Sequence, residues 1–201
     1  MGVLHLRGII SSDRPLLVVA VEEEATHLHA ADLPILITGV GKVNAAASTA
    51  AALATATPSM VINMGTAGGL KAGITGTHVI TRVMQHDLNS DAIFALIGHH
   101  VGEPIDVHLP AWLPAQHQRS TLASGDVFVS DPAVRDRLAQ QADLVDMEGY
   151  AVARTARLAG VPALLVKQVS DSADGTAGRT WVETVHECAE VLGDWVREHL
   201  R

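Results

Sequence analysis

Short apolar runs of strand length, recurring between helical patterns, constrain the fold of this chain more than any other feature. Five of these runs are predicted to be strands: Leu16–Val21, Leu33–Thr38, Met60–Met64, Val79–Met84 and Ala163–Ser170. Their apolarity is continuous rather than alternating, which is typical of strands that are covered on both faces. The runs are also far shorter than the ~20 residues of a membrane-spanning helix. The sequence therefore predicts an internal sheet and no membrane span.

Four further segments are predicted to be helices: Lys42–Ala56, Pro132–Gln141, Met147–Ala159 and Thr180–Leu200. Asp131 is a good N-cap for the second helix, and Gly160 with Pro162 ends the third. Strands that alternate with helices indicate a three-layer α/β/α sandwich. The stretch His86–Arg119 has weak periodicity, and we expect it to be irregular or mixed.

Size and composition favour a single cytoplasmic domain over residues 1–201. The chain has 201 residues, 48% of them hydrophobic, which is enough for one buried core. Its net charge of −8 comes without a basic block, so a nucleic-acid polymer is not expected as a partner. The lone Cys188 cannot form an internal disulfide, and the segment Met1–Asp13 lacks the pattern of a secretory signal.

Neither a metal site nor a cofactor is expected. The chain has 11 histidines, but they form no HExxH pair, and the adjacent His99 and His100 lack acids at helical spacing. Gly39 and Gly41 suggest a dinucleotide fingerprint. However, Asn44 stands where its third glycine belongs, and no acid ends the next predicted strand.

Acidic residues gather at three places in the sequence, two of them directly after predicted strands. Glu22–Glu24 come after the first strand, Asp146 and Glu148 flank the start of the third predicted helix, and Asp171 follows the last strand. Ligands of open α/β sheets bind beyond the carboxyl ends of the strands, so these acids can meet in one crevice. The alternatives are a solvated helix N-terminus for the glutamates and a cap or turn for Asp171.

Two glycine-rich segments and one aromatic residue also have two interpretations each. Gly39–Ser48 is a glycine turn that opens a helix, and Asn63–Leu70 is predicted to be a glycine-rich loop after a buried strand. Either segment can bind an anion through its backbone amides or can simply allow a tight turn. Phe128, beside a Ser-Gly-Asp turn, can stack on a base or pack in the core.

Six motifs in order resemble one family. They are AVEEE, GVGKVNAA, NMGTAGG, ASGDVF, LVDMEGYA and VSDSADG, and they run collinearly from about Leu16 to Trp181. The set resembles the methylthioadenosine and S-adenosylhomocysteine nucleosidases of the purine nucleoside phosphorylase superfamily. The resemblance implies a central mixed β-sheet, a small-molecule purine nucleoside and water as substrates, and a homodimer.

The resemblance also implies roles for individual residues. Asp171 donates a proton to purine N7 with the help of Ser170, and Glu24 orients and deprotonates the attacking water. Carboxylates around the sugar stabilise the positive charge that develops on it in the transition state. The other implied substrate contacts are made by Glu148 and Met147 on the ribose hydroxyls, and by Phe128 and Val129 on the purine.

Hydrolysis and phosphorolysis occur at similar sites within this superfamily. The N-terminal glycine and arginine phosphate motif of the phosphorylases is absent here, and the corresponding AVEEE turn would repel phosphate. Water is therefore the expected nucleophile. The nucleosidases usually have an arginine four residues before the catalytic aspartate, where this chain has Lys167, which keeps the charge but not the bidentate fork. Lys167 and Thr66 are candidates for organising the water.

The 5′ substituent of the nucleoside stays open. Trp181 falls where the family has a late aromatic residue of the 5′ pocket, although it can equally be a core residue, and Asp87–Phe94 is where the partner subunit is expected to contribute. Methylthioadenosine, S-adenosylhomocysteine, 5′-deoxyadenosine and futalosine are all possible substrates. A phosphorylase and a non-catalytic nucleoside-binding protein are the alternative functions, although the joint presence of Glu24, Glu148 and Asp171 disfavours the second.

Overall fold

The computed structural model describes residues 5–28 and 32–200, so the first four residues of the segment Met1–Asp13 lie outside it. Its strands are β1 (Leu6–Arg7), β2 (Leu16–Val19), β3 (Ile35–Ile37), β4 (Val61–Gly69), β5 (Thr77–Gln85), β6 (Ile105–Asp106), β7 (Gln118–Ser124), β8 (Leu144–Asp146) and β9 (Ala163–Asp171). Its helices are α1 (Glu22–Ala25), α2 (Lys42–Thr55), α3 (Ser90–Ile97), α4 (Pro132–Leu138), α5 (Gly149–Leu158) and α6 (Ala177–His199). All five predicted strands and all four predicted helices are confirmed, with shifted ends.

The strands form one mixed sheet in the order β1-β3-β2-β4-β8-β7-β5-β6, and β9 pairs with both β4 and β5. β2 is parallel to β3 and β4, whereas β4–β8 and β5–β9 are antiparallel. Pairing therefore runs from β4 through β8, β7, β5 and β9 back to β4, and this part of the sheet closes on itself. Closure leaves these strands without an open edge.

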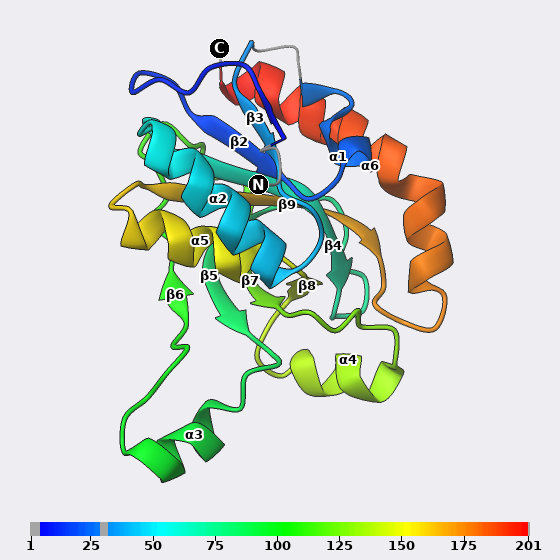
Figure 1. Cartoon of the computed structure of the whole chain (residues 1–201). Helices are drawn as coiled ribbons and strands as arrows, with labels where there is room; N and C mark the ends of the chain where they lie inside the picture. The colour runs from blue at the N-terminus through cyan, green and yellow to red at the C-terminus, as the bar shows by residue number, and fades with distance from the viewer. Residues whose placement is uncertain (1–4, 29–31, 201) are drawn as a thin grey trace.

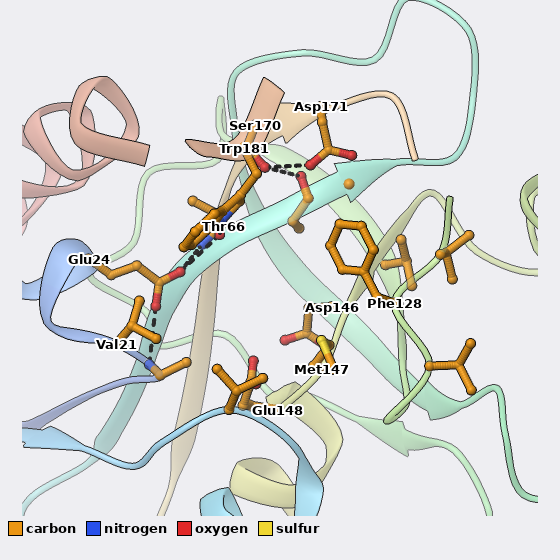
Figure 2. Close-up of a pocket in the computed structure, with 17 residues that line it drawn as sticks. Val21, Glu24, Thr66, Phe128, Asp146, Met147, Glu148, Ser170, Asp171 and Trp181 are labelled. Carbon is orange, nitrogen blue, oxygen red and sulfur yellow. Dashed lines mark hydrogen bonds between the residues drawn. The ribbon is translucent and has the colours of Figure 1, made fainter. Parts of the chain in front are cut away.

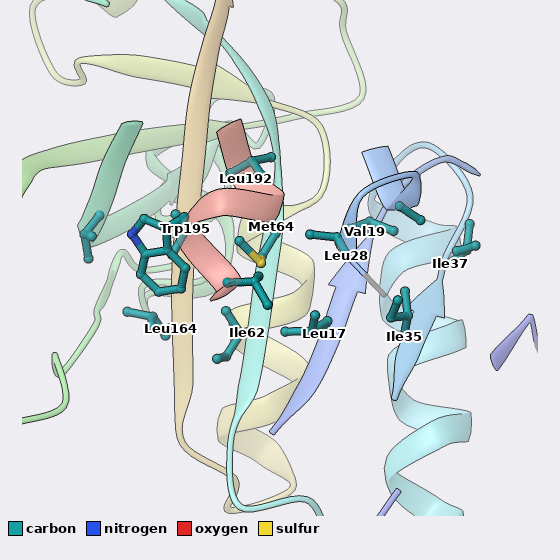
Figure 3. Close-up of a cluster of buried hydrophobic side chains, with 14 of the residues drawn as sticks. Leu17, Val19, Leu28, Ile35, Ile37, Ile62, Met64, Leu164, Leu192 and Trp195 are labelled. Carbon is teal, nitrogen blue, oxygen red and sulfur yellow. The ribbon is translucent and has the colours of Figure 1, made fainter. Parts of the chain in front are cut away.

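Helices cover the sheet on two sides, as Figure 1 shows. α2 and α5 pack together on one face, and α1 and α6 lie on the other. The continuous apolarity of β2 follows directly from this arrangement. Leu16 and Val18 pack in the cluster under α2 and α5, whereas Leu17 and Val19 pack against Leu192 and other residues of the α6 side (Figure 3).

The structure tests two predictions about local structure. The prediction of a loop over Asn63–Leu70 is wrong, because β4 continues to Gly69. The stretch His86–Arg119 is mixed, as expected: it contains α3, β6 and the first residues of β7. Within the described residues, no helix combines the length and the apolarity that crossing a membrane requires.

Candidate active site

A cavity of about 240 Å³ opens at the carboxyl ends of β2, β4, β8 and β9 (Figure 2). Nine of the ten predicted site residues line it: Glu24, Thr66, Phe128, Val129, Met147, Glu148, Ser170, Asp171 and Trp181. The remaining residue, Lys167, is buried beneath this lining. Segments that are distant in the sequence therefore bring their acids to one place.

Glu24 lies in the short helix α1, and three hydrogen bonds hold its carboxylate in place. Its Oε1 accepts from the backbone N–H of Thr66 (2.7 Å) and from the Thr66 hydroxyl (2.9 Å), and its Oε2 accepts from the Ala20 N–H (3.1 Å). Glu24 is only 4% exposed. The alternative interpretation, a solvated carboxylate at a helix N-terminus, therefore applies to the exposed Glu22 and Glu23 and not to Glu24. Glu22, by contrast, pairs on the surface with Arg7 and His5.

The glycines of β4 allow the acids to come close to the strand. A Cβ atom on Gly65 would lie 2.8 Å from Glu24 Oε1, and one on Gly68 would lie 3.1 Å from Asp171 Oδ1. Side chains at these positions would push both carboxylates away from the strand. The glycine-rich motif thus serves close approach within a strand rather than a loop.

Asp171 ends β9 and is oriented by its neighbours. The Ser170 hydroxyl donates to Asp171 Oδ2 (2.8 Å), and the Ala173 N–H donates to Oδ1 (2.8 Å). The second bond is the turn contact that the alternative interpretation predicted for this aspartate. Asp171 nevertheless lines the cavity, so the turn aims its carboxyl group inward.

Glu148 lies at the start of α5 and is 8% exposed. Its Oε1 accepts a hydrogen bond from the Gly41 N–H at the start of α2 (2.8 Å). Burial, followed by repulsion from Asp146, raises the pKa of Glu148 from 4.5 to about 7, although Lys167 and the Gly41 N–H favour its ionised form. The carboxyl group therefore changes charge near neutral pH.

Asp146 and Lys167 form a buried ion pair under the cavity. Lys167 Nζ lies 2.8 Å from Asp146 Oδ2, and the same carboxylate accepts from the Ser124 hydroxyl and from the Gly149 N–H (2.8 Å). Burial alone would lower the pKa of Lys167, but the carboxylates of Asp146, Glu148 and Glu24 outweigh it and raise that pKa. Lys167 thus supplies a fixed positive charge below three acids.

A ring of polar contacts holds the segment that precedes Phe128. Asp126 Oδ1 accepts from the Lys42 N–H (2.7 Å), the Asp126 N–H donates to Asp87 Oδ2 (2.8 Å), and Lys42 Nζ pairs with Asp87. Phe128 is 48% exposed at the cavity, so it is not a core residue. The three residues of this ring come from separate segments of the sequence, namely GVGKVNAA, ASGDVF and the region after Gln85. The sequence alone therefore did not predict their contacts.

The arrangement suits a reaction in which positive charge develops on a bound molecule. Glu24, Asp146, Glu148 and Asp171 contribute carboxyl groups to one cavity, and an aromatic ring borders it. Among the described residues, the lining includes no lysine or arginine side chain. A substrate that becomes cationic in its transition state would be stabilised here, whereas an anionic reactant would be repelled.

Comparisons with known proteins show which family the chain belongs to. A family model described as the phosphorylase superfamily matches residues 24–198. A 5′-methylthioadenosine/S-adenosylhomocysteine nucleosidase of Marinomonas sp. is 33% identical over 188 residues, which cover 85% of this chain and 81% of that protein. The protein of the same name from Actinobacillus succinogenes is 35% identical over 183 residues, covering 79% and 78%.

Solved structures share the fold. A Helicobacter pylori nucleosidase mutant with 5′-methylthioadenosine in its active site matches with a TM-score of 0.83 at 22% identity, covering 94% of this chain and 98% of that one. A futalosine hydrolase mutant of Helicobacter pylori matches with a TM-score of 0.81 at 20% identity, covering 93% and 98%. The resemblance seen in the six motifs is thereby confirmed. The chain belongs to the phosphorylase superfamily and, within it, to the 5′-methylthioadenosine/S-adenosylhomocysteine nucleosidase family.

Proposed function

We propose that this protein hydrolyses the N-glycosidic bond of a 5′-modified adenosine and releases adenine and the free sugar. The observation that carries this proposal is the convergence of Glu24, Glu148 and Asp171 on one cavity that Phe128 also borders. Groups that act on a single ribosyl bond must reach it together, and a shared cavity supports that role for these three. The nucleosidase relatives supply the substrate class.

In the proposed reaction, Asp171 acts as the general acid. It transfers its proton to N7 of the purine while the C1′–N9 bond breaks and its electron pair leaves with the base. The hydrogen bonds from Ser170 and Ala173 fix the direction of the carboxyl group. A protonated purine is a better leaving group, so the charge left on the sugar is the main remaining barrier.

Glu24 acts at the other side of the sugar in this proposal. The oxygen of the water molecule forms a bond to C1′, and one of its protons passes to Glu24. This proton then returns to Asp171 through solvent. Glu148 and the Met147 backbone hold the ribose hydroxyls, and Phe128 stacks on the purine with Val129 at its edge. Lys167 is buried, is paired with Asp146 and does not line the cavity, so we propose that it acts through the acids above it.

Water is favoured over phosphate as the nucleophile by the charge of the lining. Phosphorolysis needs cationic groups that bind a second anionic substrate. In the described lining all four ionisable side chains are acids, and Lys167 is already paired with Asp146. We therefore propose that catalysis requires no phosphate and no cofactor.

We further propose that the protein works as a homodimer in the cytoplasm. α3 contains no buried residue, and it extends away from the body of the molecule in Figure 1. It exposes Phe94, Leu96 and Ile97, and such an apolar surface is stable in water when a partner covers it. A second copy of this chain is the proposed partner. The cytoplasmic location is supported by the single free, buried Cys188.

The test is a substrate panel with and without phosphate. The purified protein is incubated with methylthioadenosine, S-adenosylhomocysteine, 5′-deoxyadenosine, adenosine, inosine and futalosine, and release of free base is followed. We expect release from 5′-modified adenosines in phosphate-free buffer. Release that requires phosphate, with sugar 1-phosphate as the product, would make the protein a phosphorylase, and no release at all would favour a binding protein.

A further inference from the structure

Trp181 makes a hydrogen bond that reaches Glu24 through one intermediate residue. Its Nε1–H donates to the hydroxyl of Thr66 (2.9 Å), and that hydroxyl lies 2.9 Å from Glu24 Oε1 (Figure 2). The three residues come from α6, β4 and α1 respectively. A helix at the far end of the chain is thus linked to the carboxylate that is proposed to act on water.

The chemistry of the groups sets the direction of this chain of bonds. An indole N–H can only donate, and a hydroxyl has one proton of its own. Because Thr66 Oγ1 accepts from Trp181, its proton is left to point at Glu24 Oε1. Trp181 therefore removes the freedom of the hydroxyl to turn away from the carboxylate.

The bonds also distinguish the two oxygens of Glu24. Oε1 accepts two hydrogen bonds, from the N–H and the hydroxyl of Thr66, whereas Oε2 accepts one, from the Ala20 N–H at 3.1 Å. A carboxylate oxygen has about two lone-pair sites, so Oε1 is saturated and Oε2 keeps one site open. Oε2 is then the oxygen that is available to a water molecule.

We propose that Trp181 is a positioning residue for the reaction: through Thr66 it locks Glu24 so that Oε2 alone receives the proton of water. This inference rests on the proposed hydrolytic function. It gives Trp181 a second role, because Trp181 also forms part of the cavity wall. The two roles have different kinetic consequences. A wall residue changes KM according to the 5′ substituent, whereas a residue that orients Glu24 changes kcat for every nucleoside.

The test uses Trp181→Phe, which keeps an aromatic ring and removes the N–H. We expect kcat to fall about tenfold with methylthioadenosine, 5′-deoxyadenosine and adenosine alike, as for the loss of one hydrogen bond to an orienting polar group. The matched control is Trp195→Phe in the same helix. Trp195 is buried in the core cluster of Figure 3, and its Nε1 has no hydrogen-bond partner within the described residues, so kcat should not change.

Substitutions at Thr66 test the link itself. Thr66→Val removes the hydroxyl and should lower kcat at least as much as Trp181→Phe, whereas Thr66→Ser should retain most of it. Because Trp181 acts through this hydroxyl, the double variant should be no slower than Thr66→Val alone. Circular dichroism and thermal unfolding verify that each variant is folded.

Two results would overturn the inference. One is an unchanged kcat in Trp181→Phe with only a KM that varies with the 5′ group, and the other is a double variant whose losses multiply. Both are separable from failure of the proposed function, which would show as no base release by the unmodified protein.

Discussion

At the scale of single residues, the most unusual group is the carboxyl of Glu148. It is almost fully buried beside Asp146, and its pKa is raised to about 7 from 4.5. The folded protein therefore holds this proton more tightly than the unfolded chain does. Ionising Glu148 costs stability, and the cost is absent below pH 4.5, grows between pH 4.5 and about 7, and is complete above that. Above about pH 7, the negative charge of Glu148 therefore lowers the stability of the folded protein.

Glu148→Gln should therefore stabilise the protein at high pH. A rise in pKa from 4.5 to about 7 corresponds to about 3 kcal/mol, so the variant should gain up to that amount at pH 8 and almost nothing at pH 4. Urea unfolding at both pH values measures the difference, with the exposed Glu23→Gln as the control. The same variant should lose base release, since an amide accepts more weakly from the ribose hydroxyls. Equal or lower stability at pH 8 would contradict this account of Glu148.

The sequence was sufficient to identify the acids of the site but not how they are paired. Glu24 and Asp171 follow predicted strands, Glu148 lies at the start of a predicted helix, and the motifs implied a role for each of them. The contact between Lys167 and Asp146 depends on how β8 and β9 lie on the two sides of β4, which no local pattern reveals. The hydrogen bond from Trp181 to Thr66 likewise depends on where α6 packs.

At the scale of elements, β9 and β8 are joined by the buried pair of Lys167 and Asp146. Asp146 also accepts from the Gly149 N–H, so the pair is connected to the first residue of α5. A buried ion pair contributes little net stability, but removing one partner leaves an uncompensated charge. The start of α5, with Glu148 next to it, should depend on this pair.

Lys167→Met should consequently destabilise the protein by about 3–5 kcal/mol. Adding Asp146→Asn removes the isolated carboxylate and should restore much of that loss, although not the activity. Urea unfolding of both single variants and of the double variant at pH 7 provides the measurement. Losses that simply add in the double variant would show that the two side chains are not coupled.

The strands that were predictable are those that contain a run of apolar residues. β2 and β3 are apolar and buried throughout, and β5 and β9 each contain an apolar run that is interrupted by polar residues. β6 and β8 contain two and three residues, and β7 begins with the polar residues Gln118, Arg119 and Ser120, so none of the three has a strand signal of its own. β4 was cut short in the prediction because glycines inside a strand resemble a loop unless the acids packed on them are known.

At the scale of the whole molecule, the closed part of the sheet carries the cavity, and α3 stands apart from it. The proposed dimer explains why an apolar helix is placed there. Composition predicted one core and an α/β fold, but it contained no information on which surface meets a second copy. The resemblance placed the partner near Asp87–Phe94, and the proposal of α3 as the contact surface rests on its having no buried residue.

The protein should sediment as a dimer at micromolar concentration, and Leu96→Asp should shift it towards the monomer. Leu96 is 83% exposed on α3, and a carboxylate there would have to be desolvated in the interface. Leu158→Asp, at a similarly exposed position on α5, is the control and should stay dimeric. Analytical ultracentrifugation distinguishes the two states. An unmodified protein that sediments as a monomer would exclude the proposed dimer.

We propose that three carboxylates in one cavity break a ribosyl bond with water. The most direct measurement is the rate of adenine release from methylthioadenosine in phosphate-free buffer by the unmodified protein, Asp171→Asn and Glu24→Gln. We expect release by the unmodified protein and a loss of at least about 100-fold in each variant, because each substitution removes a proton-transfer group. Release that persists unchanged in Asp171→Asn would show that Asp171 is not the general acid.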